Sequence, residues 1–227
     1  MIHRISGKDK HYDTVFIDFD GTIADTCEGI INAVHYMFDH IGMKENDEKE
    51  LLKFIGPPVK HHLMDYYGFS EPKAAEAYAH FREYYRQTGL FQSRLYDGIE
   101  DVLGRIKAAV ETLCIATSKP EIMASTLIEK FGIAHYFNGI YCADHDNGIY
   151  NKTQVLQNAM KRLARVPINT VMVGDRYHDI EGAIAVGIDS IGVLYGYGDY
   201  NELTAAGCDY LADTPIDLVR LLEGEKP

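Results

Sequence analysis

The amino-acid sequence predicts an α/β fold, a doubly wound parallel sheet with a small all-helical domain inserted near its start. Short apolar runs that end at Gly, Asp, Ser or Thr are typical of buried parallel strands. Such runs lie at residues 15–17, 112–116, 170–173 and 190–194, with a weaker one at 136–141. Helical patterns separate them, at 98–110, 121–131, 152–163 and 178–186. Strands that alternate with helices indicate a parallel sheet covered on both faces.

One segment interrupts this alternation. From about residue 26 to residue 95 the sequence is helical throughout, with Gly and Pro between the helical stretches and no clear strand pattern. We therefore expect an α/β core domain made of residues 1–24 and 96–227, and a helical cap domain made of residues 25–95. The first dozen residues are expected to be frayed.

Composition narrows the kinds of partner and the compartment. The 227 residues include 22 basic and 34 acidic side chains, a net charge of −12, which disfavours binding to nucleic acid polymers or to an anionic membrane. The four cysteines form no Cys-x-x-Cys pair, which argues against a structural zinc site or a disulfide scaffold. No apolar run approaches the roughly 20 residues of a membrane span, and residues 1–13 are too polar for a secretory leader. We expect a cytoplasmic protein, either a monomer or a homodimer.

Polar residues follow several of the predicted strands, where the functional groups of such sheets collect. They are Asp18 and Asp20, Thr117 and Ser118, Lys152 in a loop, and Asp175 and Asp179. Carboxylates brought together in a partly buried site are unfavourable unless a cation or a proton compensates them. Oxygen ligands without His or Cys suit a hard ion such as Mg²⁺, which often binds together with a substrate phosphate. The sequence therefore predicts a magnesium site at one edge of the sheet.

These motifs resemble those of the haloacid dehalogenase (HAD) superfamily of phosphatases. "DFDGT" is similar to its first motif, "ATS" to its second, Lys152 to its third and "GDRYHD" to its fourth. The stretches "IGPPV", "ATSKP" and "GDRYHDIEGAIAVGIDSIGVLYGYG" bring the resemblance closest to the phosphoglycolate phosphatase and bacterial 5′-nucleotidase-like branch. The resemblance implies a HAD-like Rossmannoid core, with the helical insertion in the place of the family's smaller cap.

The resemblance also implies a role for each residue. Asp18 would be the nucleophile that forms an aspartyl-phosphate, and Asp20 would protonate the leaving alcohol and then deprotonate the lytic water. Thr117 would hydrogen-bond a phosphoryl oxygen, and Lys152 would neutralise Asp18 and the transferring group. Phosphate or substrate would be bound by Gly21, Thr22, Ser118 and Pro57, and Mg²⁺ by Asp18, Asp20 (through its carbonyl oxygen), Asp175 and Asp179.

Three assignments have alternatives. Ser118 offers the same hydroxyl as Thr117, and either could cap a helix. Lys119 lies near the same strand ends as Lys152 and competes with it for the catalytic role, since Lys152 is followed by Thr153 where related phosphatases often have Pro. The aromatic residues of the cap are expected to form its core rather than a stacking platform for a nucleobase; they are Tyr66, Tyr67, Phe69, Tyr78, Phe81, Tyr84 and Tyr85. His61 and His62 are expected on exposed helix faces.

The function expected from these features is Mg²⁺-dependent hydrolysis of a small phosphorylated metabolite, with phosphoglycolate as the first substrate. One alternative is a 5′-nucleotidase that acts on nucleoside monophosphates. A second is a phosphomutase similar to β-phosphoglucomutase, which shares all four core motifs. The non-enzymatic alternative is a phospho-accepting or phosphate-binding module, although a receiver-type module lacks a cap, and the pair Asp18 and Asp20 argues for turnover.

Overall fold

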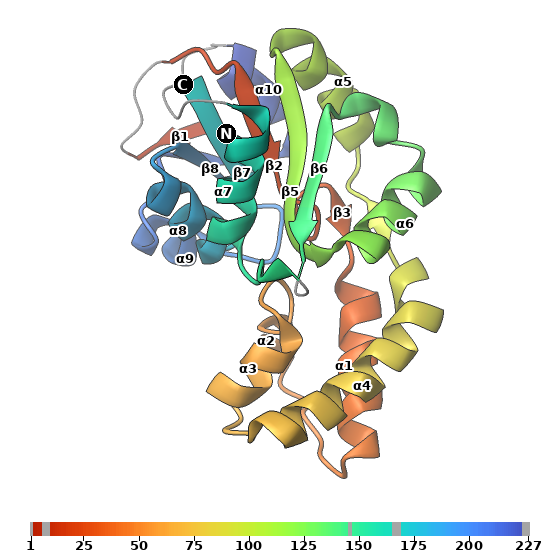
Figure 1. The fold of residues 1–227 in the computed structure, drawn as a ribbon. Coiled ribbons are helices and arrows are strands. Elements are labelled where there is room, and N and C mark those ends of the chain that lie inside the picture. The colour runs from red at the N-terminus through yellow and green to blue at the C-terminus, as the bar shows by residue number, and fades with distance from the viewer. Residues whose placement is uncertain (1, 6–9, 145–146, 165–168, 224–227) are drawn as a thin grey trace. The chain divides into compact units, whose positions relative to one another are not determined.

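The chain divides into two compact units in the computed structural model, which describes residues 2–5, 10–144, 147–164 and 169–223 (Figure 1). The core unit combines Met1–Ala24 with Leu95–Pro227. The helical unit is Asp25–Arg94. The core unit contains a large sheet, and the helical unit consists mainly of helices.

A seven-stranded sheet forms the centre of the core unit, in the order β1-β9-β8-β7-β2-β5-β6. Neighbouring strands are parallel, except that β1 runs antiparallel to β9. The strands are β1 (Ile2–Arg4), β2 (Thr14–Ile17), β5 (Thr112–Pro120), β6 (Gly139–Ala143), β7 (Thr170–Gly174), β8 (Asp189–Val193) and β9 (Tyr210–Ala212). The predicted α/β fold with a mostly parallel sheet is confirmed.

Helices cover both faces of this sheet. On one face α7 packs against α8, and on the other α5 packs against α10 (Figure 1). The helices of the core unit are α5 (Ile99–Ala109), α6 (Glu121–Phe131), α7 (Lys152–Leu163), α8 (Tyr177–Val186), α9 (Tyr200–Ala205) and α10 (Pro215–Glu223). Parallel strands need crossover connections, which helices such as α6 between β5 and β6, α7 between β6 and β7, and α8 between β7 and β8 provide.

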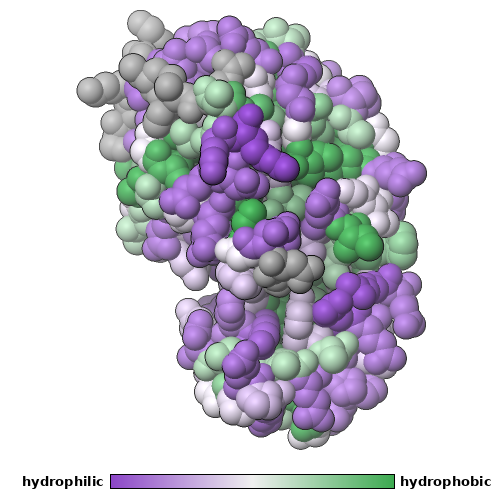
Figure 2. Space-filling model, viewed as in Figure 1, coloured by the Kyte–Doolittle hydropathy of each residue, from purple (hydrophilic) through white to green (hydrophobic). Residues whose placement is uncertain are grey.

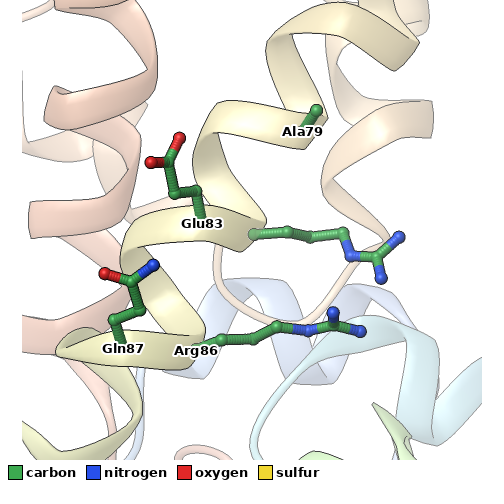
Figure 3. A pocket seen from close by; sticks show the side chains of 5 residues that line it. Ala79, Glu83, Arg86 and Gln87 are labelled. Atoms are coloured by element: carbon green, nitrogen blue, oxygen red, sulfur yellow. The ribbon is translucent and has the colours of Figure 1, made fainter.

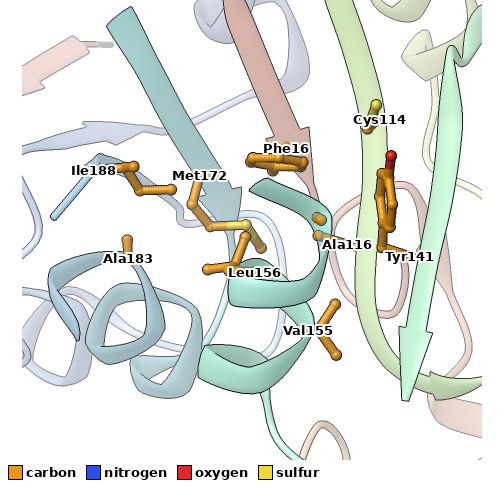
Figure 4. Packing of buried hydrophobic residues seen from close by; sticks show 10 residues of the cluster. Phe16, Cys114, Ala116, Tyr141, Val155, Leu156, Met172, Ala183 and Ile188 are labelled. Atoms are coloured by element: carbon orange, nitrogen blue, oxygen red, sulfur yellow. The ribbon is translucent and has the colours of Figure 1, made fainter. Parts of the chain in front are cut away.

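The layer between the sheet and α7 is a packed apolar core. Phe16 of β2, Met172 of β7 and Leu156 of α7 are all fully buried and meet there (Figure 4). Phe16 and Met172 lie at the same level because β2 and β7 pair with these two residues opposite each other. This packing keeps the two central strands in register, and it thereby positions the residues that follow them.

The sheet differs from the prediction in three places. The expectation of a frayed start is wrong for β1, which pairs with β9; strands of three residues are too short to show a periodic pattern. The weak run at 136–141 is displaced, because Ala134–Tyr136 forms a 3-10 turn and β6 begins only at Gly139. The strand at 112–116 continues to Pro120 as β5, with a register shift against β6 between Thr117 and Pro120.

The helical unit is built around α1 and α4, which pack along each other. Its helices are α1 (Cys27–His40), α2 (Glu48–Leu52), α3 (Val59–Asp65) and α4 (Glu71–Gln87), followed by a 3-10 turn at Gly89–Phe91, and β3 (Ala24–Asp25) and β4 (Arg94–Leu95) form a separate two-stranded sheet. The buried residues of α4 are Ala74, Ala77, Phe81 and Tyr85. Their spacing of three and four positions places them on one stripe of the helix.

The aromatic residues of the helical unit divide between its interior and its surface. Phe69, Phe81 and Tyr85 are buried as expected, whereas Tyr66 is 64% exposed. The expectation of an exposed His62 is wrong, since this residue is only 4% exposed. Its ring stacks on Tyr66 and meets the ring of Phe54 at a steep angle, so aromatic packing stabilises the buried imidazole.

The visible surface is largely hydrophilic (Figure 2), as a chain with 25% charged residues predicts. Exposed large hydrophobic side chains, such as Ile122 on α6 and Ile184 on α8, lie on separate helices, which is ordinary for a folded protein. Within the described ranges no helix is long and apolar enough to cross a membrane.

Leu156→Ala should lower the free energy of unfolding by about 2–5 kcal/mol, because it leaves a cavity between α7 and the sheet. Ile184→Ala on the neighbouring helix α8 is the matched control; its side chain is 55% exposed, so the loss should be below about 1 kcal/mol. Urea unfolding of both variants measures the difference. Equal losses would contradict the placement of Leu156 in the core.

Candidate active site

The carboxyl ends of three central strands meet at one edge of the sheet. Ile17 of β2 lies opposite Ile115 of β5 on one side and Val173 of β7 on the other. The next residue, Asp18, donates its backbone N–H to the carbonyl oxygen of Val173 (2.9 Å). The polar residues that follow these strands are therefore brought to a common level, as the sequence predicts.

Three buried carboxylates meet at this edge, and we refer to them as the acidic triad: Asp18 after β2, Asp175 after β7, and Asp179 in the first turn of α8. One ligand oxygen from each lies within 4.8 Å of the others. The three residues are 5%, 0% and 0% exposed. Because hard divalent cations bind carboxylate oxygens, the triad could hold a metal ion.

The start of α8 fixes Asp179. The Oδ2 atom of Asp179 accepts the N–H of Arg176 (3.1 Å), and the N–H of Asp179 donates to the carbonyl oxygen of Arg176 (3.0 Å). The Asp179 side chain thus accepts the N–H of the N-cap residue, as the acidic residue of a capping box does, while the backbone carbonyl of Arg176 accepts the N–H of Asp179. Glu202 of α9 accepts hydrogen bonds from Arg176 Nε (2.8 Å) and the Tyr177 N–H (3.0 Å), and so holds the same turn.

Two neighbouring segments hold Asp175. The Tyr197 N–H donates to Oδ2 of Asp175 (2.8 Å), and the hydroxyl of Thr22 lies 3.4 Å from Oδ1. Thr22 therefore contacts a carboxylate of the triad, while its predicted phosphate contact stays a prediction. The sequence analysis assigns no role to Tyr197, although the glycines beside it in "GYG" are a signal for close backbone approach.

Lys152 lies among these carboxylates. It begins α7, is 2% exposed, and its Nζ lies 2.8 Å from Oδ1 of Asp18 and 2.8 Å from Oδ1 of Asp179. Nζ donates its hydrogen bond to the carbonyl oxygen of Ala116 (2.8 Å). With three N–H donors, the Lys152 ammonium group can serve this carbonyl oxygen and one oxygen of each carboxylate. It compensates only part of the negative charge of the acidic triad.

Burial and mutual repulsion shift the pKa values of these groups. Burial raises the pKa of Asp18 to about 6; Lys152 opposes this shift and Asp179 adds to it. Burial also raises the pKa of Asp175 well above its usual value, and Asp179 and Asp18 raise it further. Burial alone would lower the pKa of Lys152, but Asp179 and Asp18 outweigh this effect and raise it. A cation bound here would favour the ionised carboxylates.

The carboxylate of Asp20 contacts a different cation. The Nζ of Lys119 lies 2.9 Å from Oδ1 and 3.0 Å from Oδ2 of Asp20, and the two side chains are 4% and 12% exposed. Both Lys119 and Lys152 therefore lie in the site. Lys119 contacts Asp20, and Lys152 contacts Asp18 and Asp179. The metal contact of the Asp20 carbonyl oxygen stays a prediction.

Three further predicted residues lie nearby. Thr117 is 2% exposed at the end of β5, where its hydroxyl oxygen accepts the Lys119 N–H (3.2 Å), and the half-buried Ser118 follows it. Gly21 has a φ of +78°, and a Cβ added there would lie 2.1 Å from Oδ2 of Asp175. Its own N–H donates to the carbonyl oxygen of Ala24 (2.9 Å). Only glycine permits this approach to Asp175, and the phosphate contacts of these residues stay predictions.

Pro57 belongs to the helical unit, where it precedes Pro58, the N-cap residue of α3. Its contact with substrate stays a prediction. The helical unit has a pocket of its own along α4, with a volume of about 410 Å³. It is lined by Ala79, Arg82, Glu83, Arg86 and Gln87. Figure 3 shows Arg86 pointing away from Glu83 and Gln87. The positive charge of Arg86 and the negative charge of Glu83 therefore lie on different sides of α4.

Gly21→Ala should destabilise the protein more than Gly187→Ala. Both glycines have positive φ, but an added Cβ at Gly187, the C-cap of α8, meets nothing within 4 Å. The control should lose about 1 kcal/mol from backbone strain, and Gly21→Ala about 1–3 kcal/mol more because the methyl group overlaps Asp175. Urea unfolding measures both losses, and equal losses would show that Asp175 is not held against Gly21.

Comparison with known proteins adds evidence for the family. The model of the family described as haloacid dehalogenase-like hydrolase matches residues 15–193. A 5′-nucleotidase from Pseudomonas aeruginosa is 37% identical over 194 residues, 86% of this chain and 88% of that protein. Tyrosine-protein kinase PtkA from Mycobacterium tuberculosis is 35% identical over 195 residues, 86% of this chain and 66% of that protein. A phosphoglycolate phosphatase from Chromobacterium violaceum is 28% identical over 222 residues, 94% of this chain and 98% of that protein.

A solved structure shows the same fold. The crystal structure of a predicted phosphatase from Clostridium acetobutylicum superposes with a TM-score of 0.89 and 36% identity, and the match covers 93% of this chain and 98% of that chain. The residues matched by the family model contain the whole acidic triad as well as Asp20, Lys119 and Lys152. The chain therefore belongs to the haloacid dehalogenase-like hydrolases.

Proposed function

We propose that the protein is a Mg²⁺-dependent phosphomonoester hydrolase that takes the phosphoryl group onto Asp18 before passing it to water. The observation that supports this most is the acidic triad around the Lys152 ammonium group at one edge of the sheet. A carboxylate nucleophile, an oxygen-ligand metal site and a fixed cation are parts that phosphoryl transfer uses. The family match supports the hydrolase class.

Asp18 acts as the nucleophile in this proposal. Its carboxylate oxygen forms a bond to phosphorus while the bond from phosphorus to the leaving oxygen breaks, which gives an aspartyl-phosphate. Lys152, whose Nζ is 2.8 Å from Oδ1 of Asp18, stabilises the negative charge on the transferring group. With a pKa of about 6, Asp18 is mostly ionised at neutral pH, as a nucleophile must be.

Asp20 acts as the general acid and the general base in this proposal. In the first step it gives a proton to the leaving oxygen. In the second step it takes a proton from water as the water oxygen attacks phosphorus, inorganic phosphate leaves and the Asp18 carboxylate is restored. Phosphoryl contacts are assigned to Gly21, Thr22, Thr117 and Ser118, and a substrate contact to Pro57.

The residues present fit a divalent cation. One carboxylate oxygen from each residue of the acidic triad lies within 4.8 Å of the others, and burial together with the charges of Asp179 and Asp18 raises the pKa of Asp175, as uncompensated negative charge does. Asp18 and Asp175 would hold Mg²⁺ by their carboxylates and Asp20 by its carbonyl oxygen, with Asp179 reaching it directly or through water. When bound, the ion supplies positive charge to the phosphoryl oxygens.

Nucleoside monophosphates are the substrates that we propose first. The sequence analysis favours phosphoglycolate, but the relative named 5′-nucleotidase is 37% identical, against 28% for the phosphoglycolate phosphatase. The exposed ring of Tyr66, stacked on His62, also offers an aromatic surface in the helical unit on which a base could stack. The identities to these relatives thus favour nucleoside monophosphates, whereas the sequence motifs alone favour phosphoglycolate.

Phosphate release from a panel of compounds tests this function. The protein should release inorganic phosphate from a nucleoside monophosphate faster than from phosphoglycolate or sugar phosphates, and only with Mg²⁺. Asp18→Asn should lower kcat by about 10⁴-fold or more, because it removes the nucleophile. Asp101→Asn, at an exposed position of α5, is the matched control and should keep kcat within about twofold.

The other outcomes of this assay are equally informative. Fastest release from phosphoglycolate would overturn the nucleotide assignment and leave the hydrolase standing. Transfer of the phosphoryl group to a second sugar phosphate instead of water would identify a phosphomutase. Absence of release from every compound by a folded protein would contradict the hydrolase. Transfer from ATP to tyrosine would indicate the activity named for the mycobacterial relative.

Mg²⁺ should stabilise the protein against heat more at about pH 7.5 than at about pH 5. The pKa of Asp18 is raised from 3.8 to about 6 on folding, and that of Asp175 is also raised. At pH values between the unfolded-state and folded-state pKa of these carboxyl groups, the metal-free folded state therefore binds more protons than the unfolded state. The metal-free protein loses stability as the pH rises through this range. Mg²⁺ binds the ionised triad and offsets this loss.

Thermal unfolding with Mg²⁺ and with chelator, at both pH values, measures the effect. Asp175→Asn should abolish most of the Mg²⁺ response at the higher pH, because it removes one ligand charge. A Mg²⁺ shift of equal size at both pH values, or one that survives in Asp175→Asn, would place the bound ion elsewhere.

A further inference from the structure

Lys119, which lies outside the acidic triad, contacts the carboxylate of Asp20. The ammonium group of Lys119 contacts both carboxylate oxygens of Asp20, at 2.9 Å and 3.0 Å. The two side chains are only 4% and 12% exposed, so water screens the contact weakly. A charge-assisted contact to both oxygens restricts the carboxylate in rotation as well as in position.

The backbone of Lys119 is itself held in place. Its N–H donates to the hydroxyl oxygen of Thr117 (3.2 Å), and Pro120, the next residue, is the N-cap of α6. The register shift between β5 and β6 falls on this same stretch, from Thr117 to Pro120. Irregularities of this kind at the end of a strand redirect side chains. The ammonium group of Lys119 thus reaches Asp20 from a fixed point on the sheet.

The two lysines of the site have separate partners. Lys152 contacts Asp18 and Asp179, whereas Lys119 contacts Asp20. Lys152 is therefore placed to act on the nucleophile and the transferring group. Lys119 is placed to act on the residue that, in the proposed function, moves protons.

We infer that Lys119 is a positioning residue, which holds the Asp20 carboxylate in the place from which it exchanges protons with the leaving oxygen and the lytic water. The inference rests on the proposed function, in which Asp20 is the acid and base. A proton transfer is efficient only within hydrogen-bond reach, and a misplacement of about 1 Å can lower a rate by about 100-fold. Without Lys119, the nearly buried Asp20 carboxylate loses its ion pair and turns toward other partners.

A double-mutant cycle tests whether Lys119 acts through Asp20. The variants are Lys119→Met, Asp20→Asn and the double variant, assayed with Mg²⁺ on the panel compound that the wild-type protein hydrolyses fastest. Lys119→Met should lower kcat by about 10-fold to 100-fold and leave KM within about twofold, since a residue that acts through Asp20 affects proton transfer and not substrate binding. In the Asp20→Asn background the same substitution should change kcat by less than about twofold.

Two further variants complete the design. Lys119→Arg keeps a cation that can contact both oxygens, and it should retain more of kcat than Lys119→Met. Lys161→Met, at an exposed position of α7, is the matched control and should leave kcat and KM unchanged. If Lys119→Met does not fold, as judged by thermal unfolding, the cycle is carried out with Lys119→Gln, which keeps one donor and a similar length.

The outcomes separate this inference from the proposed function. Equal losses of kcat in the wild-type and Asp20→Asn backgrounds, or a loss expressed mainly in KM, would show that Lys119 acts on substrate directly and would overturn the inference. No phosphate release by the wild-type protein would overturn the proposed function instead. Release that is lost in Asp18→Asn but unchanged in Lys119→Met would leave the hydrolase intact and refute the role of Lys119.

Discussion

Negative charge buried at one end of the sheet is the constraint on which the site depends. The acidic triad and Asp20 contribute four carboxylates, and Lys119 and Lys152 contribute two ammonium groups. When all of these groups are ionised, their net charge is −2, which one divalent cation would balance. Buried charge without compensation is costly, which explains the raised pKa values of Asp18 and Asp175. The charge balance and the oxygen ligands thus favour the same kind of ion.

The fold keeps these charges together by means that act on the backbone. Parallel pairing of β2 with β5 and β7 sets the three strand ends at one level. The hydrogen bond from the Arg176 N–H holds the Asp179 carboxylate at the start of α8, and the Tyr197 N–H and the absence of a side chain at Gly21 fix Asp175. The site therefore depends on contacts between segments that are distant in sequence, such as Gly21 and Tyr197 against Asp175.

The sequence predicts those features that local patterns determine. Buried apolar runs before "DFDGT" and "GDRYHD" place Asp18 and Asp175 at the same sheet edge, because parallel strands carry their functional groups at their carboxyl ends. The pairing of Lys119 with Asp20 is not predictable in this way, since Lys119 reaches Asp20 from the irregular end of β5. The short strands β1 and β9 have too few residues for a periodic pattern, and the burial of His62 depends on rings distant in sequence.

Anomalous diffraction from crystals containing Mn²⁺ would show whether the acidic triad binds a divalent ion. Mn²⁺ is a suitable substitute because it also prefers oxygen ligands. We expect one strong anomalous peak within coordination distance of Asp18 and Asp175, with Lys152 retained on the other side of Asp18. A peak elsewhere, or a triad without a bound ion at saturating Mn²⁺, would contradict it.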